Sequence, residues 1–376
     1  MEHYLDNSAT TRVCPEAAQA AIVAMTECYG NPSSTHTEGR EAKKLLDRSR
    51  AQVASLLGCQ AQELVFTSCG SESDNWALLG GAEAKKRSGV HIISSAVEHD
   101  AIRRSLDELE CRGFTVTRLK PDRSGAIPVE AVEHALTPDT ILVSLMLVNN
   151  ETGAVTDISG VSRLLKASAS PALLHTDAVQ AFGKLPFTPR SLGADLISVS
   201  GHKLHAPKGV GALYIRSGLR LKPFVVGGGQ EEGRRAGTEA LPQIAAFGTA
   251  CALAKEGLAE NGARMAALKR DCIGQLAAAI PDFTWVETAA PHILNLSLPG
   301  YRSEVLMNFL EAREIYVSKS SACKKGARSH VLEAIGLDAR TIDGAIRVGL
   351  SRYTTQEDID ALCQGLIDAH RTLKHR

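Results

Sequence analysis

Short apolar runs alternate with longer amphipathic segments through the first 215 residues of the chain. The apolar runs are four to eight residues long and rich in β-branched residues, as is typical of buried strands. They occupy residues 64–67, 91–94, 114–119, 141–148, 173–176, 196–199 and 210–215. Helical patterns separate them, for example at 38–57, which is closed by Gly58. This alternation predicts an α/β fold with a mainly parallel sheet and helices on both of its faces.

The remainder of the chain has a different order of elements. Residues 242–279 are alanine-rich and have a mostly helical composition. Strands are expected at 292–298, 315–318 and 346–350, with helices at 303–312 and from about Gln356. A chain of 376 residues is also too long for one ordinary domain, so we expect two structural domains.

Composition excludes several classes of protein. Lys plus Arg and Asp plus Glu both number 42, which argues against a broad surface for nucleic acid. The longest apolar run has eight residues, far short of the roughly 20 that a membrane helix needs. The amino terminus has no basic and apolar signal segment, so we expect a cytoplasmic protein. The nine cysteines are odd in number, scattered and never spaced as CxxC, which predicts neither a disulfide framework nor a metal site.

Lys203 stands where a buried strand would emerge into a turn. The apolar run at 196–199 ends in Ser200-Gly201-His202-Lys203. A lysine amine becomes nucleophilic when partial burial or nearby positive charge lowers its pKa from about 10.4, and a strand end offers such burial beside a crevice. The alternative is that Lys203 is a solvated turn lysine, because lysine is rarely buried.

Two further segments supply what a pyridoxal 5′-phosphate (PLP) site needs besides a lysine. Residues 68–75 lead from a strand into a helix, and the free N–H groups of such a turn can bind phosphate. Asp177 follows a strand and could hold a protonated pyridine nitrogen. The alternatives are ordinary helix caps, by Ser71 and Asp74 in the first segment and by Asp177 in the second.

Other polar residues fall at the same ends of the predicted strands. Parallel strands bring their carboxyl ends to one edge of a sheet, where ligands bind. The polar residues at these ends are Ser71, His99, Asn150, Asp177, Gln180, Ser200, His202 and Lys203. The glycine-rich segment 227–238 contains no GxGxxG that opens a helix, which disfavours a nicotinamide-dependent dehydrogenase.

Ten segments of the chain resemble the group I cysteine desulfurases: YLDNSATT, GNPSS, TSCGSESDN, VEHDA, VNNETG, HTDAVQ, SGHK, GGGQEEGRRAGT, SSAC and IRVGLSRYTT, in this order. These PLP enzymes have the class V aminotransferase fold and serve iron–sulfur and nitrogenase cofactor assembly. The resemblance implies PLP-dependent transferase fold type I, with a mainly parallel seven-stranded sheet in a large domain of residues 13–250. It also implies a smaller α+β domain formed by residues 1–12 and 251–376.

The resemblance implies roles for residues around PLP. Lys203 would bind the cofactor as a Schiff base, Asp177 would pair with its pyridine nitrogen, and Gln180 would bond its phenolic oxygen. His99 would stack on the ring and act as acid and base. The phosphate would be held by Gly70, Ser71, Ser200 and His202, with Thr238 reaching it from the other subunit of a homodimer.

The substrate would be bound by a second group of residues. Arg347 would clasp the α-carboxylate as a fork, a geometry that suits arginine. Asn150 would contact both cofactor and substrate, and Asn31 would assist. Considered without the family, the local pattern favours a capping or core histidine for His99, and for Arg347 a strand-end surface arginine paired with a carboxylate.

Cys323 is the implied nucleophile. It lies in the polar segment 319–326, which contains three lysines, Lys319, Lys324 and Lys325. The family usually has glycine at the Lys319 position and small hydroxyl residues after the cysteine, so this chain departs from the pattern. One hypothesis is that the lysines lower the thiol pKa and attract an acidic acceptor, and the alternative is a solvated basic loop without effect.

The implied reaction converts L-cysteine to L-alanine and leaves a persulfide on Cys323. The sulfur would pass to an acceptor or iron–sulfur scaffold protein, whose identity the sequence does not give. A selenocysteine lyase is the nearest alternative, and an aminotransferase is disfavoured because it would not need Cys323. A non-catalytic sulfur-transfer scaffold is disfavoured because the residues implied in catalysis are all present, namely Lys203, Asp177, His99 and Cys323.

Overall fold

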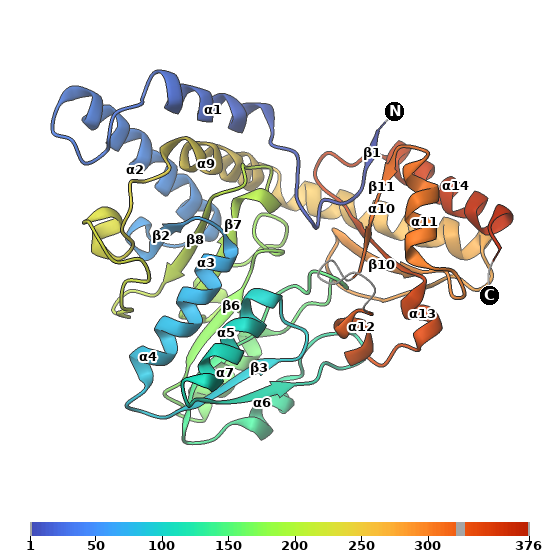
Figure 1. Ribbon diagram of the computed structural model, residues 1–376, viewed down its shortest axis with the longest axis horizontal. Coiled ribbons are helices and arrows are strands. Elements are labelled where there is room, and N and C mark those ends of the chain that lie inside the picture. Colours follow the sequence, from blue (N-terminus) through green and yellow to red (C-terminus); the bar gives the residue numbers. More distant parts are fainter. Residues whose placement is uncertain (1, 321–327, 375–376) are drawn as a thin grey trace.

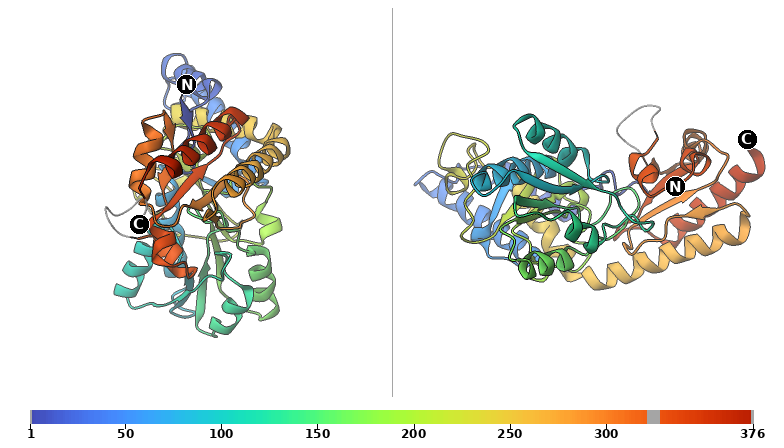
Figure 2. Two further views of the ribbon diagram at one scale, coloured as in Figure 1. Left: turned by 90° about the vertical axis from the view of Figure 1, so that its right-hand side faces the viewer. Right: turned by 90° about the horizontal axis from the view of Figure 1, so that it is seen from below.

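A computed structural model describes residues 2–320 and 328–374 of the chain. Two regions lie end to end along its long axis, one built on a large central sheet and the other on the C-terminal elements (Figures 1 and 2). A long helix, α10 (Leu258–Ala279), runs along one side of the C-terminal region. No helix in the described part of the chain is long and apolar enough to cross a membrane.

The central sheet has seven strands in the order β2-β8-β7-β6-β5-β3-β4. Its strands are β2 (Leu64–Thr67), β3 (His91–Ser95), β4 (Thr115–Leu119), β5 (Thr140–Ser144), β6 (Leu173–Asp177), β7 (Leu196–Ser200) and β8 (Gly211–Ile215). The pairs from β4 to β7 are parallel, and β8 runs antiparallel to both of its neighbours. The predicted mainly parallel sheet is therefore confirmed.

The run predicted as one strand at 141–148 is shorter in the structure. Strand β5 ends at Ser144, although Leu145 and Leu147 still donate backbone hydrogen bonds to β6. The four residues after Ser144 are still buried. Leu145, Leu147 and Val148 belong to the core on one face of the sheet, and Met146 and Val148 line the pocket described below. The apolar run continues past the strand because the residues at the end of the sheet are also buried. Sequence periodicity alone does not distinguish such buried residues from a strand.

Alternate residues of the strands enter two cores on opposite faces of the sheet. Ile93, Val143, Leu174 and Ile197 belong to one core, whereas their neighbours Ile92, Leu142, Leu173 and Leu196 belong to the other. This division follows from the two-residue period of a strand, and it explains why the strands are apolar without alternation.

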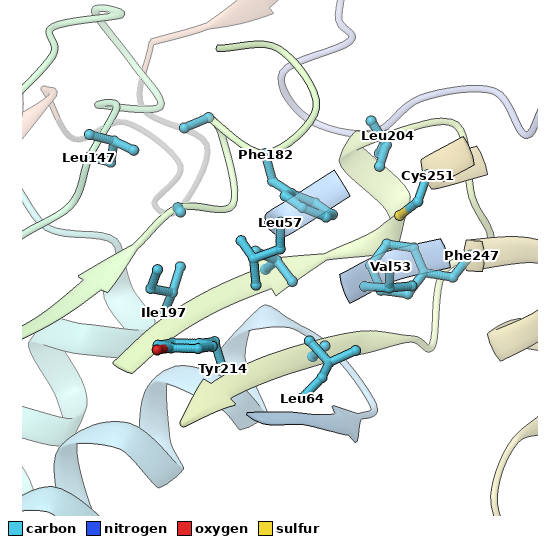
Figure 3. Close-up of a cluster of buried hydrophobic side chains, with 14 of the residues drawn as sticks. Val53, Leu57, Leu64, Leu147, Phe182, Ile197, Leu204, Tyr214, Phe247 and Cys251 are labelled. Atoms are coloured by element: carbon cyan, nitrogen blue, oxygen red, sulfur yellow. The ribbon is translucent and has the colours of Figure 1, made fainter. Parts of the chain in front are cut away.

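Helices α2 (Thr37–Leu57) and α9 (Leu241–Glu256) cover the first face. Figure 3 shows Val53 of α2 beside Phe247 of α9, and Leu57 of α2 near Phe182 and Ile197. The same core receives side chains from α1 (Pro15–Thr26), α6 (Val129–Ala135) and α7 (Ile158–Ala167), and the short α8 (Pro189–Leu192) lies near α7. The predicted helix at 38–57 is confirmed, and Gly58 closes it with φ of 75°.

A continuous helical stretch and one further helix cover the second face. The stretch consists of α3 (Gly70–Asn75), the π-helical turn η2 (Trp76–Gly80) and α4 (Gly81–Lys85). It packs with α5 (Asp100–Cys111) through the fully buried Trp76, Leu78, Ile102 and Leu106. The start of α3 is thereby fixed at the carboxyl edge of the sheet.

The C-terminal region contains a four-stranded antiparallel sheet and a two-stranded parallel one. The first has the order β12 (Ser318–Lys319), β13 (Ala345–Gly349), β10 (Ile293–Ser297) and β9 (Thr284–Trp285), and the second pairs β1 (His3–Tyr4) with β11 (Ile315–Tyr316). Its helices are α10, α11 (Ser303–Glu311), α12 (His330–Ala334), α13 (Ala339–Asp343) and α14 (Gln356–Thr372).

Two predictions in this region need correction. The predicted strand at 315–318 is two short strands in different sheets, because β11 pairs with the N-terminal β1 whereas Ser318 crosses to β13. The strand expected at 292–298 is the shorter β10 (Ile293–Ser297), and all five of its residues are buried, so both of its faces are covered. Leu294 and Leu296 pack in the C-terminal core, and Asn295 faces the large region and contacts Glu151.

The division of the chain into two domains remains a proposal. Leu5 packs in the C-terminal core, in keeping with an N-terminal segment that belongs there. Cys251 and Ala254 pack in the first core of the central sheet. We therefore propose that the second boundary lies at Gly257, between α9 and α10, and not at residue 250.

Candidate functional site

A pocket of about 370 Å³ opens at the carboxyl edge of the central sheet. It is lined by all eight polar residues that the sequence places at strand ends, together with Gly70 and Arg347. Ser8 and Ala9 of the N-terminal segment, Cys69, Asp74, Met146, Val148, Glu151 and Val179 complete the lining. The strand-end prediction is therefore confirmed for this group of residues.

Lys203 is partly buried at the end of a short helical turn. Strand β7 ends at Ser200 and is followed by η3 (Gly201–Lys203). The Nζ atom donates to the carbonyl oxygens of Ser8 at 2.5 Å and Ala9 at 2.6 Å. Burial, and then the nearby Arg347, lower the pKa of Lys203 to about 8. The alternative of a solvated turn lysine is wrong.

Asp177 ends β6 and is 6% exposed. Its Oδ1 accepts a bond from Val179 N at 2.9 Å, but a turn and not a helix follows, so the helix-cap alternative is wrong. Burial raises the pKa of Asp177, and the Val179 bond and the nearby His99 and Lys203 oppose that rise. The carboxylate therefore faces the cationic side of the pocket.

Uncharged polar groups lie beneath Asp177. Burial raises the pKa of Asp74 well above its usual value and raises that of Glu98 to about 8. Burial lowers the pKa of His175 to about 3, and its ring bonds Ser144 Oγ at 2.9 Å and Ser198 Oγ at 3.0 Å. Because Glu98 and His175 are mainly neutral near pH 7, they add little charge to compete with Asp177.

The start of α3 forms one end of the pocket. Cys69 is the N-cap residue and makes no side-chain cap bond, and Ser71 and Asp74 lie inside the helix. The capping alternative for these two residues is therefore wrong, and the first N–H groups have no intrahelical acceptor. A Cβ at Gly70 would lie 2.8 Å from Val179 Cγ2, so only glycine fits without a shift.

Two residues after β7 complete this end of the pocket. Ser200 Oγ is buried and has no hydrogen-bond partner among the described residues. His202 Nδ1 lies 3.2 Å from Thr10 Oγ1, and burial lowers the pKa of His202 to about 4. A neutral histidine and free hydroxyl and N–H groups are suited to a bound phosphate.

His99 both caps a helix and lines the pocket. It is the N-cap residue of α5, and its Nδ1 accepts a bond from Ala101 N at 3.1 Å. The capping alternative is thus confirmed, and it does not exclude a role in the site. Because Nδ1 accepts, the proton of the neutral ring lies on Nε2.

Gln180 is fixed by two bonds at the base of the pocket. Its Nε2 donates to Ser8 O at 2.9 Å, and its Oε1 lies 3.4 Å from Lys184 Nζ. Burial lowers the pKa of Lys184 to about 7. The amide orientation therefore depends on a lysine that the sequence analysis did not select.

Arg347 extends from the C-terminal sheet into the pocket. It lies on β13, is 3% exposed and donates to Asn150 O at 2.8 Å and Ser318 Oγ at 2.9 Å. Asp6 Oδ1 lies 3.3 Å from Nη2, and Nε has no partner in the described part of the chain. The alternative of a surface arginine is wrong, although its pairing with a carboxylate is correct.

Three of the predicted residues are not brought together with this group. Cys323 lies outside the described residues, as do Lys324 and Lys325. Asn31 and Thr238 are exposed and do not line the pocket, so one chain alone gives no support to their roles. Lys319 pairs with Glu304 at 2.6 Å, and this pairing weakens the hypothesis that its charge acts on the Cys323 thiol.

Sequence reasoning missed the N-terminal carbonyls and two acidic residues of the site. The carbonyls of Ser8 and Ala9 give no side-chain signal, and Asp74 was considered only as a cap. Glu151 directly follows Asn150, and that adjacency was the available signal. Among the described residues, no group of three or more His, Cys, Asp and Glu side chains is placed to hold a metal ion, and the eight described cysteines are free thiols.

Comparisons with known proteins agree with this geometry. The family model described as aminotransferase class-V matches residues 3–362. A Trichormus variabilis protein named cysteine desulfurase 2 is 44% identical over 368 residues, 96% of this chain and 91% of that protein. A solved structure titled NifS-like protein has a TM-score of 0.93 and 37% identity, covering 99% of this chain and 100% of that one.

A further solved structure is titled SspA in complex with cysteine. It has a TM-score of 0.82 and 31% identity, and the match covers 94% of this chain and all of that one. The family match spans most of the chain, and the relatives match almost end to end. The chain therefore belongs to the class V aminotransferase family and, within it, to the cysteine desulfurases.

Proposed function

We propose that this enzyme uses PLP to remove sulfur from L-cysteine, leaving L-alanine and a persulfide on Cys323. The observation that supports this most is the pocket in which Lys203, Asp177 and the unpartnered Ser200 hydroxyl lie together. The relative solved in complex with cysteine supports the choice of substrate.

The residues of the pocket fit PLP. A phosphate oxygen would supply the partner that the buried Ser200 Oγ lacks, beside the free N–H groups of Gly70 and Ser71. Asp177 would hold the pyridine nitrogen in its protonated form, and Gln180 would bond the phenolic oxygen. When bound through Lys203, PLP supplies a ring that withdraws electron density from the α-carbon of an amino acid.

Arg347 would bind the α-carboxylate of the substrate. Its Nε is buried without a partner, and its contact with Asp6 is long at 3.3 Å. A substrate carboxylate can therefore take Nε and Nη2 as a fork, with Asp6 displaced. The bond from Nη1 to Asn150 O would keep the guanidinium in place, and Asn150 would contact both substrate and cofactor.

Lys203 would move the α-proton of the substrate. An amine with a pKa of about 8 is partly neutral near pH 7.5 and can accept a proton. His99 lies on the rim with its proton on Nε2 and would serve as a second acid and base. Both residues would thus hold protons close to the substrate carbon atoms.

Cys323 would accept the sulfur atom of the substrate by nucleophilic attack. Its thiolate attacks the substrate sulfur, so an S–S bond forms and the C–S bond breaks. The electron pair of the C–S bond remains with the β-carbon, which takes up a proton and becomes the methyl group of alanine. Sulfur is oxidised to the sulfane level while the β-carbon is reduced, and no external oxidant is needed.

We also propose the assembly and partners that the family implies. Thr238 is exposed, so a homodimer in which it completes the phosphate site of the other subunit would give it a ligand. A sulfur-acceptor or iron–sulfur scaffold protein would receive the persulfide sulfur. A cytoplasmic location, and the absence of nucleic-acid and membrane partners, stay predictions from composition.

Alanine production from L-cysteine tests the function. The wild-type protein and Cys323→Ser would be assayed side by side with PLP and a thiol reductant, and parallel assays would use selenocysteine. We expect alanine from L-cysteine with the wild type and almost none with Cys323→Ser. Equal alanine from both proteins would exclude the persulfide role, and turnover of selenocysteine alone would favour a selenocysteine lyase.

A further inference from the structure

Both flanks of the segment that contains Cys323 are tied to one turn of the large region. Residues 321–327 lie outside the described part of the chain, but Ser320 and Ser329 on either side are described. Ser329 Oγ donates to Glu151 Oε2 at 2.5 Å. Ser320 Oγ accepts a bond at 2.7 Å from Asn295 Nδ2, which also donates to Glu151 O at 3.1 Å.

All of these contacts are buried. Glu151 is 6% exposed, Ser320 3%, Ser329 2% and Asn295 1%. A hydrogen bond to a carboxylate is stronger than one between neutral groups, and it gains further strength where water is excluded. These bonds therefore fix their residues far better than the exposed ion pairs Lys319–Glu304 and Arg328–Asp343, which lie near the same flanks.

The turn that holds the two flanks is itself rigid. Asn149 Oδ1 accepts bonds from Glu151 N at 2.9 Å and Thr152 N at 3.0 Å. Asn295 is the register partner of Arg347 on β13, and both side chains of this sheet donate hydrogen bonds to the turn, Asn295 to Glu151 O and Arg347 to Asn150 O. The turn at 149–152 therefore holds both Arg347, the proposed ligand of the substrate carboxylate, and the flanks of the Cys323 segment.

The charges around Glu151 affect the protonation of its carboxylate, but the bond between this carboxylate and Ser329 can persist in both protonation states. Arg347 and Arg103 attract its carboxylate, and Asp100 repels it. Burial raises the pKa of Glu151 to about 7, and the Ser329 bond and Arg347 oppose that rise. The Ser329 hydroxyl can bond either protonation state, because a hydroxyl both donates and accepts.

We propose that Glu151 is a positioning residue for sulfur transfer, because it holds both ends of the Cys323 segment beside the substrate pocket. Its carboxylate fixes Ser329 directly, and its carbonyl fixes Ser320 through Asn295. Fixing the ends of a short segment limits the volume that a thiol in it can sample, and so raises the effective concentration of that thiol at the substrate. This inference rests on the proposed function of Cys323.

Two measurements on the holoenzyme test the inference. The first is the rate of trypsin cleavage after Lys324 and Lys325, followed by mass spectrometry. The second is the rate of alanine formation in a single turnover with L-cysteine, together with KM and kcat in the steady state. The variants are Glu151→Ala, Glu151→Gln, which keeps an oxygen acceptor for Ser329, and the control Asp343→Asn, which removes only the exposed ion pair of Arg328.

For Glu151→Ala we expect faster cleavage and a loss of single-turnover rate on the order of 10- to 100-fold, as for a misplaced reacting group. The loss would lie in kcat with little change in KM, while cofactor absorbance and its change on adding L-cysteine would stay as in the wild type. Glu151→Gln would keep most of the rate, and Asp343→Asn would resemble the wild type.

Wild-type cleavage and single-turnover rates in Glu151→Ala, with Cys323→Ser inactive, would overturn the inference and leave the proposed function intact. Equal effects of Asp343→Asn and Glu151→Ala would also overturn it. If Glu151→Ala does not fold, Ser329→Gly removes the donating hydroxyl, and glycine as an N-cap costs only a few tenths of a kcal/mol. Alanine formation by Cys323→Ser would instead exclude the proposed role of Cys323. The cleavage assay would still test whether Glu151 fixes the flanks of the segment.

Discussion

The pKa of the Lys203 amine is set by opposing effects. Burial and Arg347 favour its neutral form, whereas Asp6 and Asp177 favour the ammonium. The carbonyls of Ser8 and Ala9 also favour the ammonium, because they accept bonds from it. The balance sets the pKa at about 8, low enough for a nucleophile near neutral pH.

This balance predicts how the apoprotein takes up PLP. The neutral amine is the reactive form, so the rate at which Lys203 captures PLP should rise with pH and level off above a midpoint near 8. Stopped-flow absorbance of the apoprotein between about pH 6.5 and 9.5, with Lys203→Arg as the unreactive control, measures it. A rate that is still rising steeply at the upper end of this range would contradict the lowered pKa.

At the scale of elements, close contact between α2 and α9 determines how tightly the first face is covered. A Cβ at Gly248 of α9 would lie 2.8 Å from Ser49 Cα and 2.7 Å from Gln52 Oε1 of α2. The backbone atom cannot move without shifting a helix. The glycine is therefore required by the packing, although glycine in a helix interior is intrinsically unfavourable.

Two glycine-to-alanine substitutions separate packing from helix propensity. Gly248→Ala should lower the free energy of unfolding by about 1–3 kcal/mol, through overpacking. Gly274→Ala in α10, where a Cβ meets nothing within 4 Å, should instead raise it by about 0.4–1 kcal/mol. Urea unfolding midpoints of the two variants provide the measurement, and a stabilising Gly248→Ala would contradict the close packing.

Elements with a strong local pattern were predictable from the sequence. The strands of the central sheet and the helix at 38–57 each carry their own periodicity or cap, and the strand ends located most of the pocket. The short strands of the C-terminal region were less predictable, because β11 and β12 exist only through pairing with distant strands. Contacts made by backbone atoms, such as Ser8 O with Lys203, leave no pattern in the sequence.

Long-range contacts also explain what was missed or misjudged. Glu151 acquires its contacts from Asn295 and Ser329, more than 140 residues away. His99 shows why competing interpretations of a residue need not exclude each other, because it caps α5 and faces the pocket. The polar residues at strand ends were thus easier to infer than residues such as Glu151, which act through contacts with distant parts of the chain.

At the scale of the whole molecule, the site joins parts of the chain that are far apart in sequence. The N-terminal segment contacts Lys203, and the C-terminal sheet supplies Arg347. Thr238 remains outside the pocket, on a segment that begins near the exposed Phe224, Val225 and Val226. An exposed apolar patch of this kind is typical of an interaction surface, and we place the proposed dimer interface there.

Val226 is 87% exposed and offers a test of the interface. Val226→Asp would put a charge into an apolar contact, so we expect the dimer to dissociate at a higher protein concentration than the wild-type dimer does. PLP should also be retained more weakly, because dissociation would remove Thr238 from the phosphate site of the other subunit. Sedimentation velocity over a dilution series measures the first effect and cofactor absorbance the second. Val305→Asp, at an exposed valine of α11, is the control, and equal behaviour of the two variants would exclude this interface.

The most direct test of the central claim is a single turnover with one equivalent of L-cysteine and no reductant. We predict one L-alanine per subunit and one added sulfur atom, assigned to Cys323 by mass spectrometry of the alkylated protein. Alanine formed at the same stoichiometry without added sulfur on Cys323 would contradict the account, because the sulfur would then leave by a route that does not use this cysteine.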